Sequence, residues 1–226
     1  YEMLRSLVGS EMCIRDREIV FFLNKLYKEG RIPRIPVIVD SPLSSQATLV
    51  YEKHPECYDR ETTEWLFKGN QPFEFHDLSY ITETEESIKL NDMQGPMVII
   101  SSSGMCEGGR ILHHLRHNIS DPRNIILFVG YQAENTLGRR IVEHESPVNI
   151  LGDSFEVRAR IHTINALSAH ADQLELLDYI KNIKSKIEKA FVVHGEIDKA
   201  EALASNLHQF NISDINIPAP AESFAI

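Results

Sequence analysis

Short apolar runs alternate with amphipathic segments along most of this chain, and this pattern predicts alternating strands and helices. Apolar, often β-branched runs that end abruptly in polar residues predict buried strands at residues 35–39, 97–100, 125–129, 190–193 and 215–217. Apolar residues at helical spacing predict helices at residues 18–29, 47–51, 110–117 and 137–142, after residue 170, and through residues 200–207. This order is typical of an α/β fold with a parallel sheet.

Two segments depart from this alternation. Residues 54–92 are polar, acidic and weakly periodic, which predicts short helices and loops in a surface lobe. Residues 148–151 and 155–161 are shorter alternating runs, which predict a more antiparallel region. The change of pattern places a domain boundary near residues 130–147.

Length and composition narrow the class of protein. The chain has 226 residues, 42% of them hydrophobic and 25% charged, which is ordinary for a globular protein of one large or two small domains. No apolar run approaches the roughly 20 residues of a membrane-spanning helix, and no signal-peptide core follows the N-terminus. The three cysteines are too scattered for a disulfide framework or a CxxC zinc site. We therefore expect a cytoplasmic protein with no membrane partner.

The charge distribution constrains any nucleic-acid partner. The formal net charge of −10 argues against loose binding to phosphates, which depends on Lys and Arg. Residues 52–92 hold eleven acidic and four basic residues, whereas residues 104–170 hold seven of each. A nucleic acid would have to be held by specific contacts in the second of these regions.

Polar loops follow three of the predicted strands, at Asp40-Ser41, at residues 101–109 and at residues 130–132. Binding groups gather at the carboxyl ends of parallel strands, so these loops predict a cleft. In residues 101–109, glycines allow backbone amides to approach a ligand, and serines and a helix N-terminus suit a phosphate. An ordinary strand-to-helix turn explains the loop equally well, and it is not a P-loop because no Gly-Lys-Ser/Thr follows. Asp40 either orients a substrate or caps the next helix.

Histidines supply the other candidate chemistry. His170 and His194 both lie beside small residues, and imidazole serves as a metal ligand or a proton shuttle. On spacing alone the favoured interpretation is structural, and two histidines cannot complete a catalytic zinc site, which usually has three protein ligands. His113, His114 and His117 lie on a predicted helix without the Glu of a His-Glu-x-x-His motif, which indicates a solvated or packed face.

Taken together, these segments resemble the C-terminal half of a β-CASP ribonuclease of the metallo-β-lactamase superfamily. The resemblance is greatest to prokaryotic members, which are similar to the nuclease subunit of the eukaryotic mRNA 3′-end machinery. It runs in order from residue 18 to the end, through residues 38–42, 96–100, 103–105, 108–115, 129–132, 137–138, 150–152, 168–172 and 193–196.

The resemblance implies an α/β fold made of two parts. Residues 18–129 would form a parallel-sheet β-CASP cap domain, and residues 130–226 the C-terminal part of a truncated αββα metallo-β-lactamase domain. RNA would enter between the two domains. Residues 1–17 do not resemble the family, and residues 12–17 look like translated transposase-adaptor sequence, so we expect this segment to be non-native.

The resemblance also implies roles for single residues. His194 matches a zinc ligand, and His170 matches a histidine that protonates the leaving group or orients the scissile phosphate. Ser168 and the run Ser103, Gly104 and Met105 match positions that contact RNA phosphates or lie along the RNA path. The implied mechanism is attack on phosphorus by zinc-activated hydroxide in a site with two zinc ions.

The His-x-His-x-Asp-His motif and the other zinc ligands of the family are absent from this chain, so we expect it to be inactive by itself. One alternative is a non-catalytic RNA- or nucleotide-binding module, although His170 and His194 weigh against it. The other is a small-molecule hydrolase of the same superfamily, which leaves the cap and its serine-glycine loop, residues 101–109, unexplained. Loss of RNA binding in Ser103→Ala or Arg110→Ala would favour the nuclease. RNA is the expected partner. The sequence does not decide between a monomer and a homodimer.

Overall fold

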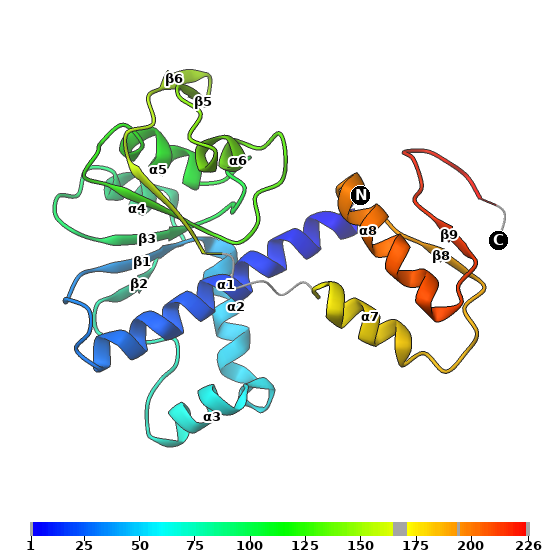
Figure 1. Ribbon diagram of the computed structural model, residues 1–226. Helices are drawn as coiled ribbons and strands as arrows, with labels where there is room; N and C mark the ends of the chain where they lie inside the picture. Colours follow the sequence, from blue (N-terminus) through cyan, green and yellow to red (C-terminus); the bar gives the residue numbers. More distant parts are fainter. Residues whose placement is uncertain (1, 165–170, 194, 225–226) are drawn as a thin grey trace. The chain divides into compact units, whose positions relative to one another are not determined.

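The computed structural model describes residues 2–164, 171–193 and 195–224, with side chains from residue 15 onward. The chain divides into two compact units, Tyr1–Ala169 and His170–Ile226, which are shown in Figure 1. Strands and helices alternate through both units, which confirms the predicted α/β class. The predicted domain boundary between residues 129 and 130 stays a prediction.

The first unit begins with a long helix, α1 (Glu2–Lys28), which starts well before the predicted residue 18. Its Val20 and Phe21 are buried in an apolar cluster against the first sheet. The helix stops before Gly30, whose φ of +67° suits glycine. Arg17 is also buried, and its Nη1 donates to the Ser44 carbonyl and to Thr48 Oγ1. That residues 1–17 are non-native stays a prediction.

The first sheet contains three parallel strands in the order β2-β1-β3. The central strand β1 (Val37–Asp40) pairs with β2 (Leu78–Tyr80) and β3 (Val98–Ser101). All four residues of β1 are buried, as expected for the middle strand of a covered parallel sheet. Strand β2 was not predicted, because an exposed serine separates its two half-exposed residues and leaves no apolar run. The rest of the predicted lobe holds a 3₁₀ turn, η1 (Pro55–Cys57), and the helices α3 (Arg60–Phe67) and α4 (Thr84–Leu90).

A second group of strands completes this unit. Strand β4 (Ile125–Val129) pairs with β7 (Arg160–Ile164) in a separate parallel sheet, and β5 (Val148–Ile150) forms an antiparallel hairpin with β6 (Asp153–Phe155). The antiparallel prediction is confirmed for the hairpin but is wrong for β7. Residues 155–161 are not one strand, because the amides of Arg158 and Ala159 turn away to donate to the Ile119 carbonyl.

Two helices, α5 (Ile111–Asn118) and α6 (Leu137–Val142), pack with these strands. The apolar cluster between them is separate from the cluster beneath α1 and includes Leu115, Ile119, Phe128, Ile141 and Val148. The three-stranded sheet thus has one apolar cluster, and the β4–β7 sheet and the β5–β6 hairpin share the other. The polar ends of the strands lie outside both clusters.

The second unit contains two helices and two strands among its described residues. Helix α7 (Gln173–Lys181) precedes β8 (Lys189–Phe191), and α8 (Ile197–Leu207) precedes a 3₁₀ turn, η2 (His208–Phe210), and β9 (Asp214–Asn216). Strands β8 and β9 pair in parallel. Ala200 and Leu207 of α8 are buried as predicted, but Leu174 of the predicted apolar face of α7 is 75% exposed.

Candidate functional site

Serine hydroxyls gather where β1 and β3 end side by side. Asp40 and Ser101 are register partners, and Ser101 Oγ donates to the Asp40 carbonyl at 3.2 Å. Ser102 Oγ lies 2.8 Å from Ser41 Oγ. Ser41 is the N-cap of helix α2 (Pro42–Lys53), because its Oγ accepts from the Ser44 amide. The capping role considered for Asp40 therefore belongs to its neighbour.

Asp40 is instead the centre of a buried polar cluster. Its side chain is 0% exposed, and Arg110 Nη1 donates to Oδ1 at 2.6 Å. Its other oxygen, Oδ2, accepts from Ser87 Oγ at 2.5 Å and lies 2.7 Å from His114 Nε2. A carboxylate without water is costly unless it is paired and hydrogen-bonded. Contacts to both oxygens meet that requirement here.

The partners of Asp40 are themselves fixed. Arg110 also donates to the carbonyls of Ile81 and Thr82, so its guanidinium is committed to the protein. His114 is buried, as the packed-face interpretation requires, and its Nδ1 lies 3.0 Å from Asn91 Oδ1. Loss of RNA binding in Arg110→Ala would therefore reflect a change in these contacts and not by itself a direct contact with RNA. The four-residue spacing of Arg110 and His114 places both on one face of α5, but it carries no signal that this face meets Asp40.

The serine-glycine loop between β3 and α5 has a defined backbone. The amide of Ser103 donates to the Gly108 carbonyl at 3.2 Å, and the Ser103 carbonyl accepts from the Cys106 amide at 3.1 Å. Gly109 has a φ of +83°, and a Cβ there would lie 2.5 Å from the Ser102 carbonyl oxygen. Cys106, beside the tip, is buried, and burial raises the pKa of its thiol to about 12. Ser103, Gly104 and Met105 are half-exposed at the tip of this hydrogen-bonded turn.

Helix α6 holds the same loop from another direction. The Leu137 amide donates to Glu107 Oε1 at 2.6 Å, and the Gly138 amide donates to the Met105 carbonyl at 3.0 Å. A Cβ at Gly138 would lie 2.0 Å from Gln132 Oε1. The predicted loop at residues 130–132 follows β4 in a different sheet, yet it reaches the serine-glycine loop through Gly138. The structure therefore brings all three predicted loops together.

The surrounding arginines are mostly paired. Four exposed or half-exposed arginines between residues 104 and 170 form ion pairs with acidic side chains: Arg116 with Asp153, Arg123 with Asp121, Arg139 with Glu143 and Arg140 with Glu145. This pairing argues against a loose basic surface and favours recognition by specific contacts.

The remaining predicted site residues, Ser168, His170 and His194, lie outside the described residues, so their roles stay predictions. Asp172 of the same motif is described and is the N-cap of α7. Its Oδ1 accepts from the Glu175 amide, and Glu175 Oε2 accepts from the Asp172 amide, each at 2.9 Å. This reciprocal pair is a capping box.

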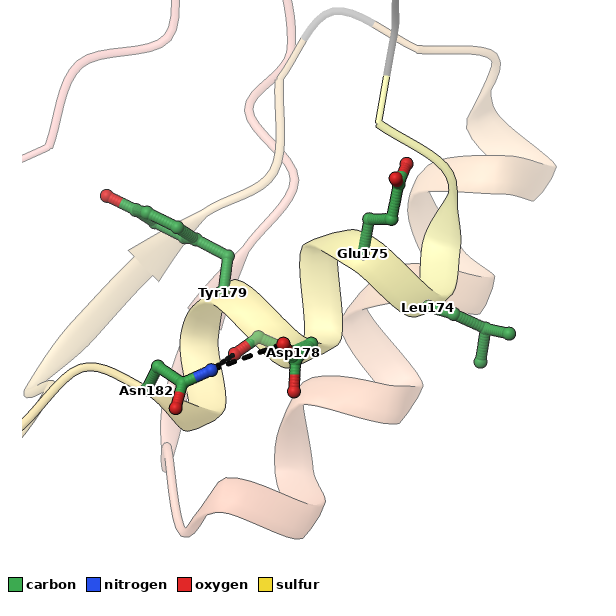
Figure 2. Close-up of a pocket in the computed structure, with 5 residues that line it drawn as sticks. All are labelled: Leu174, Glu175, Asp178, Tyr179 and Asn182. Atoms are coloured by element: carbon green, nitrogen blue, oxygen red, sulfur yellow. Dashed lines mark hydrogen bonds between the residues drawn. The ribbon is translucent and has the colours of Figure 1, made fainter. Parts of the chain in front are cut away.

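Helix α7 also carries a shallow hollow, drawn in Figure 2. All the lining residues come from one helix: Leu174, Glu175, Asp178, Tyr179 and Asn182. Asn182 Nδ2 donates back to the Asp178 carbonyl at 2.8 Å. Because a single helix provides the whole lining, the hollow is an open helix surface and not an enclosed cleft.

Metal-binding side chains do not cluster in the part of the chain that the structure describes. None of its His, Cys, Asp and Glu side chains form a group of three or more that could hold a metal ion. The described residues therefore do not fit a zinc site of the usual three or four ligands. None of the described helices is both long and apolar enough to cross a membrane.

Comparison with known proteins identifies two regions of the chain. Residues 17–141 match the model of the Beta-Casp domain, and residues 154–218 match the Zn-dependent metallo-hydrolase RNA specificity domain. The serine-glycine loop and the Asp40 cluster both lie within the first match.

Similar proteins carry two kinds of name. Ribonuclease TTHA0252 of Thermus thermophilus is 40% identical over 194 residues, which cover 85% of this chain and 43% of the relative. Transcription termination factor FttA of Pyrococcus horikoshii is 34% identical over 88% of this chain and 31% of the relative. FttA of Methanothermobacter thermautotrophicus is 32% identical over 94% of this chain and 34% of the relative. The chain thus spans less than half the length of these curated relatives.

Proposed function

We propose, because this chain belongs to the β-CASP family of zinc-dependent metallo-hydrolases, that it is part of a ribonuclease that cleaves RNA phosphodiester bonds. The observation that carries the proposal is the serine-glycine loop. Its half-exposed tip presents the Ser103 side chain, with Gly104 and Met105 beside it, at the carboxyl end of a parallel strand, and a serine hydroxyl there suits an RNA phosphate. Small ligands would not need the second matched region, which is named for RNA specificity.

The roles of single residues follow the family resemblance. Ser168 and the loop-tip residues Ser103, Gly104 and Met105 contact RNA phosphates or lie along the RNA path. His170 protonates the leaving group or orients the scissile phosphate. His194 is a ligand in a site for two zinc ions, and most of the other ligands come from parts of the protein outside this chain. The chain by itself is therefore inactive.

The test is cleavage of 5′-labelled RNA by the natural full-length protein. Its residues keep the numbers that they have in this chain. We expect cleavage that stops on zinc chelation, returns on zinc addition, and is lost in His170→Ala. Ser103→Ala should weaken RNA binding by about tenfold, the effect of one lost charge-assisted hydrogen bond. No cleavage of any RNA by zinc-loaded full-length protein would contradict the ribonuclease proposal. Zinc-dependent cleavage by the 226-residue chain would contradict its inactivity.

A role in transcription termination is a second candidate, because several relatives across archaeal species carry that name. A transcription assay separates the two functions. Release of transcripts from RNA polymerase by a His170→Ala protein that cannot cleave RNA would favour termination without hydrolysis. Release that needs an intact His170 would make termination a consequence of the ribonuclease.

A further inference from the structure

We infer that Asp40 is a positioning residue, which holds the serine-glycine loop in the shape that receives an RNA phosphate. The inference rests on the proposed function for its ligand. Asp40 does not reach the RNA itself, because its side chain is fully buried. It acts through the residues on both flanks of the loop.

The first step of the argument is where Asp40 lies. It is the last residue of the central strand of the three-stranded sheet, and β1 is flanked on both sides by parallel partners. The carboxylate joins two other elements, because Ser87 belongs to α4, His114 lies within α5 and Arg110 is the residue directly before α5. One buried anion thus fixes the end of the strand to the two helices around it.

The second step is that both ends of the loop are attached to this point. At the start of the loop, Ser101 and Ser102 bind the backbone of Asp40 and the hydroxyl of Ser41. At its end, Gly109 is followed directly by Arg110, whose guanidinium binds the Asp40 carboxylate at 2.6 Å. Both ends of the loop are therefore attached to two consecutive residues, Asp40 of β1 and Ser41 at the N-cap of α2. These attachments set the position of the loop tip.

The third step is what the charge contributes. Arg110 and Asp40 are both shielded from water, since their side chains are 17% and 0% exposed. When one partner of such a pair loses its charge, the folded protein is strongly destabilised, because the charge of the other partner stays buried without a counter-charge. Asp40→Asn keeps the shape of the side chain and one acceptor oxygen, so it weakens the attachment of Arg110 without opening a cavity. The loop should then move more freely and bind phosphate less well.

The experiment compares three variants of the natural full-length protein. Asp40→Asn is the test. Ser87→Ala removes a neutral donor to Asp40 but leaves Arg110 and His114 in place. Asn24→Ala is the matched control, because Asn24 is also fully buried and its amide donates to the carbonyls of Gln71, Pro72 and Glu74, away from the loop. Thermal unfolding establishes how much each variant loses in stability.

Two readouts separate positioning from general destabilisation. In Asp40→Asn, we expect amide hydrogen exchange in peptides covering residues 102–109 to rise, and the Kd for a short RNA to rise by about tenfold. In Asn24→Ala, stability should fall while loop exchange and RNA affinity stay near those of the unmodified protein. Ser87→Ala should lie between the two.

Unchanged loop exchange in Asp40→Asn would overturn the inference, as would equal changes in Asp40→Asn and Asn24→Ala. Failure of the proposed function looks different, because the unmodified protein would then neither bind nor cleave RNA. Loop exchange does not depend on RNA, so in that case it still decides whether Asp40 positions the loop.

Discussion

At the scale of single residues, the loop depends on one glycine far more than on its neighbour. Gly109 has a positive φ and no room for a Cβ, whereas a Cβ at Gly108 would meet nothing within 4 Å. We expect Gly109→Ala to lower the free energy of unfolding by about 1–3 kcal/mol, from strain and from displacement of the Ser102 carbonyl. Gly108→Ala should change it by less than about 0.5 kcal/mol. Urea denaturation of both variants measures the difference, and equal losses would contradict the structure.

A buried carboxylate in α1 gives the stability a pH dependence. Desolvation by burial raises the pKa of Asp16 from 3.8 to about 6, and hydrogen bonding with Ser44 and the nearby Arg17 only partly oppose it. The folded state therefore binds this proton more tightly than the unfolded state does. The resulting stabilisation is fully present below pH 3.8 and is lost as the pH rises through about 6.

Asp16→Asn removes this titration. We expect the part of the stability that falls between pH 4 and pH 7, on the order of 2 kcal/mol, to disappear in the variant. The measurement is the free energy of unfolding from urea titrations across this pH range. The slope with pH, and not the absolute stability, is the test, because the variant also removes a charge beside Arg17. An unchanged slope would show that Asp16 is not the responsible group.

Side-chain partners were the part of the site that the sequence could not predict. The loop itself was predicted, because serines and glycines directly after an apolar run mark a polar strand end. The partners of Asp40 could not be assigned, since Arg110 and His114 lie 70 and 74 residues away along the chain. Only the folded sheet and helix bring them to one point.

At the scale of secondary-structure elements, apolar runs were reliable where strands are central. Residues 35–39 were predicted as a strand, and the central strand β1 forms there because apolar side chains fill both faces of a covered sheet. Residues 97–100 were also predicted, because β3 keeps an apolar run although it lies at the edge of this sheet. Edge strands carry less of this signal. Strand β2 has three residues and a polar centre, and the parallel pairing of β7 with β4 depends on contacts between residues 35 positions apart.

The start of α7 gives a prediction at this scale. Asp172 and Glu175 form a reciprocal capping box, so the helix begins at a fixed residue. We expect Asp172→Ala to lower the free energy of unfolding by about 1 kcal/mol, because it removes the acceptor for an otherwise unpaired amide. Asp172→Asn should cost less, since asparagine is an equally good N-cap. Urea denaturation followed by circular dichroism compares the two, and identical losses would contradict the capping role.

At the scale of the whole molecule, the chain carries the loop that we propose for RNA recognition, and its described residues hold no metal site. Its two matched regions carry the serine-glycine loop and a segment named for RNA specificity. Among the residues that the structure describes, no cluster of metal-binding side chains accompanies them. Recognition and metal binding are thus separable along the sequence of the longer protein that we propose.

Zinc content tests this separation. After dialysis against zinc-free buffer, we expect the 226-residue chain to retain substoichiometric zinc, because the few remaining ligands cannot complete a site. The natural full-length protein should keep its zinc under the same conditions. Elemental analysis by mass spectrometry measures both. Tight stoichiometric binding by the chain alone would mean that it contains a metal site of its own.

The anchoring of the serine-glycine loop also has a consequence for evolution. Its shape is fixed by Asp40, Ser41, Gly109 and Gly138, all of which lie outside the exposed tip. Substitutions at the tip therefore cost the fold little, whereas substitutions at the anchors disturb it. On the proposed function, Ser103 and Met105 are therefore the positions at which we expect substitutions to alter ligand preference while the scaffold stays the same.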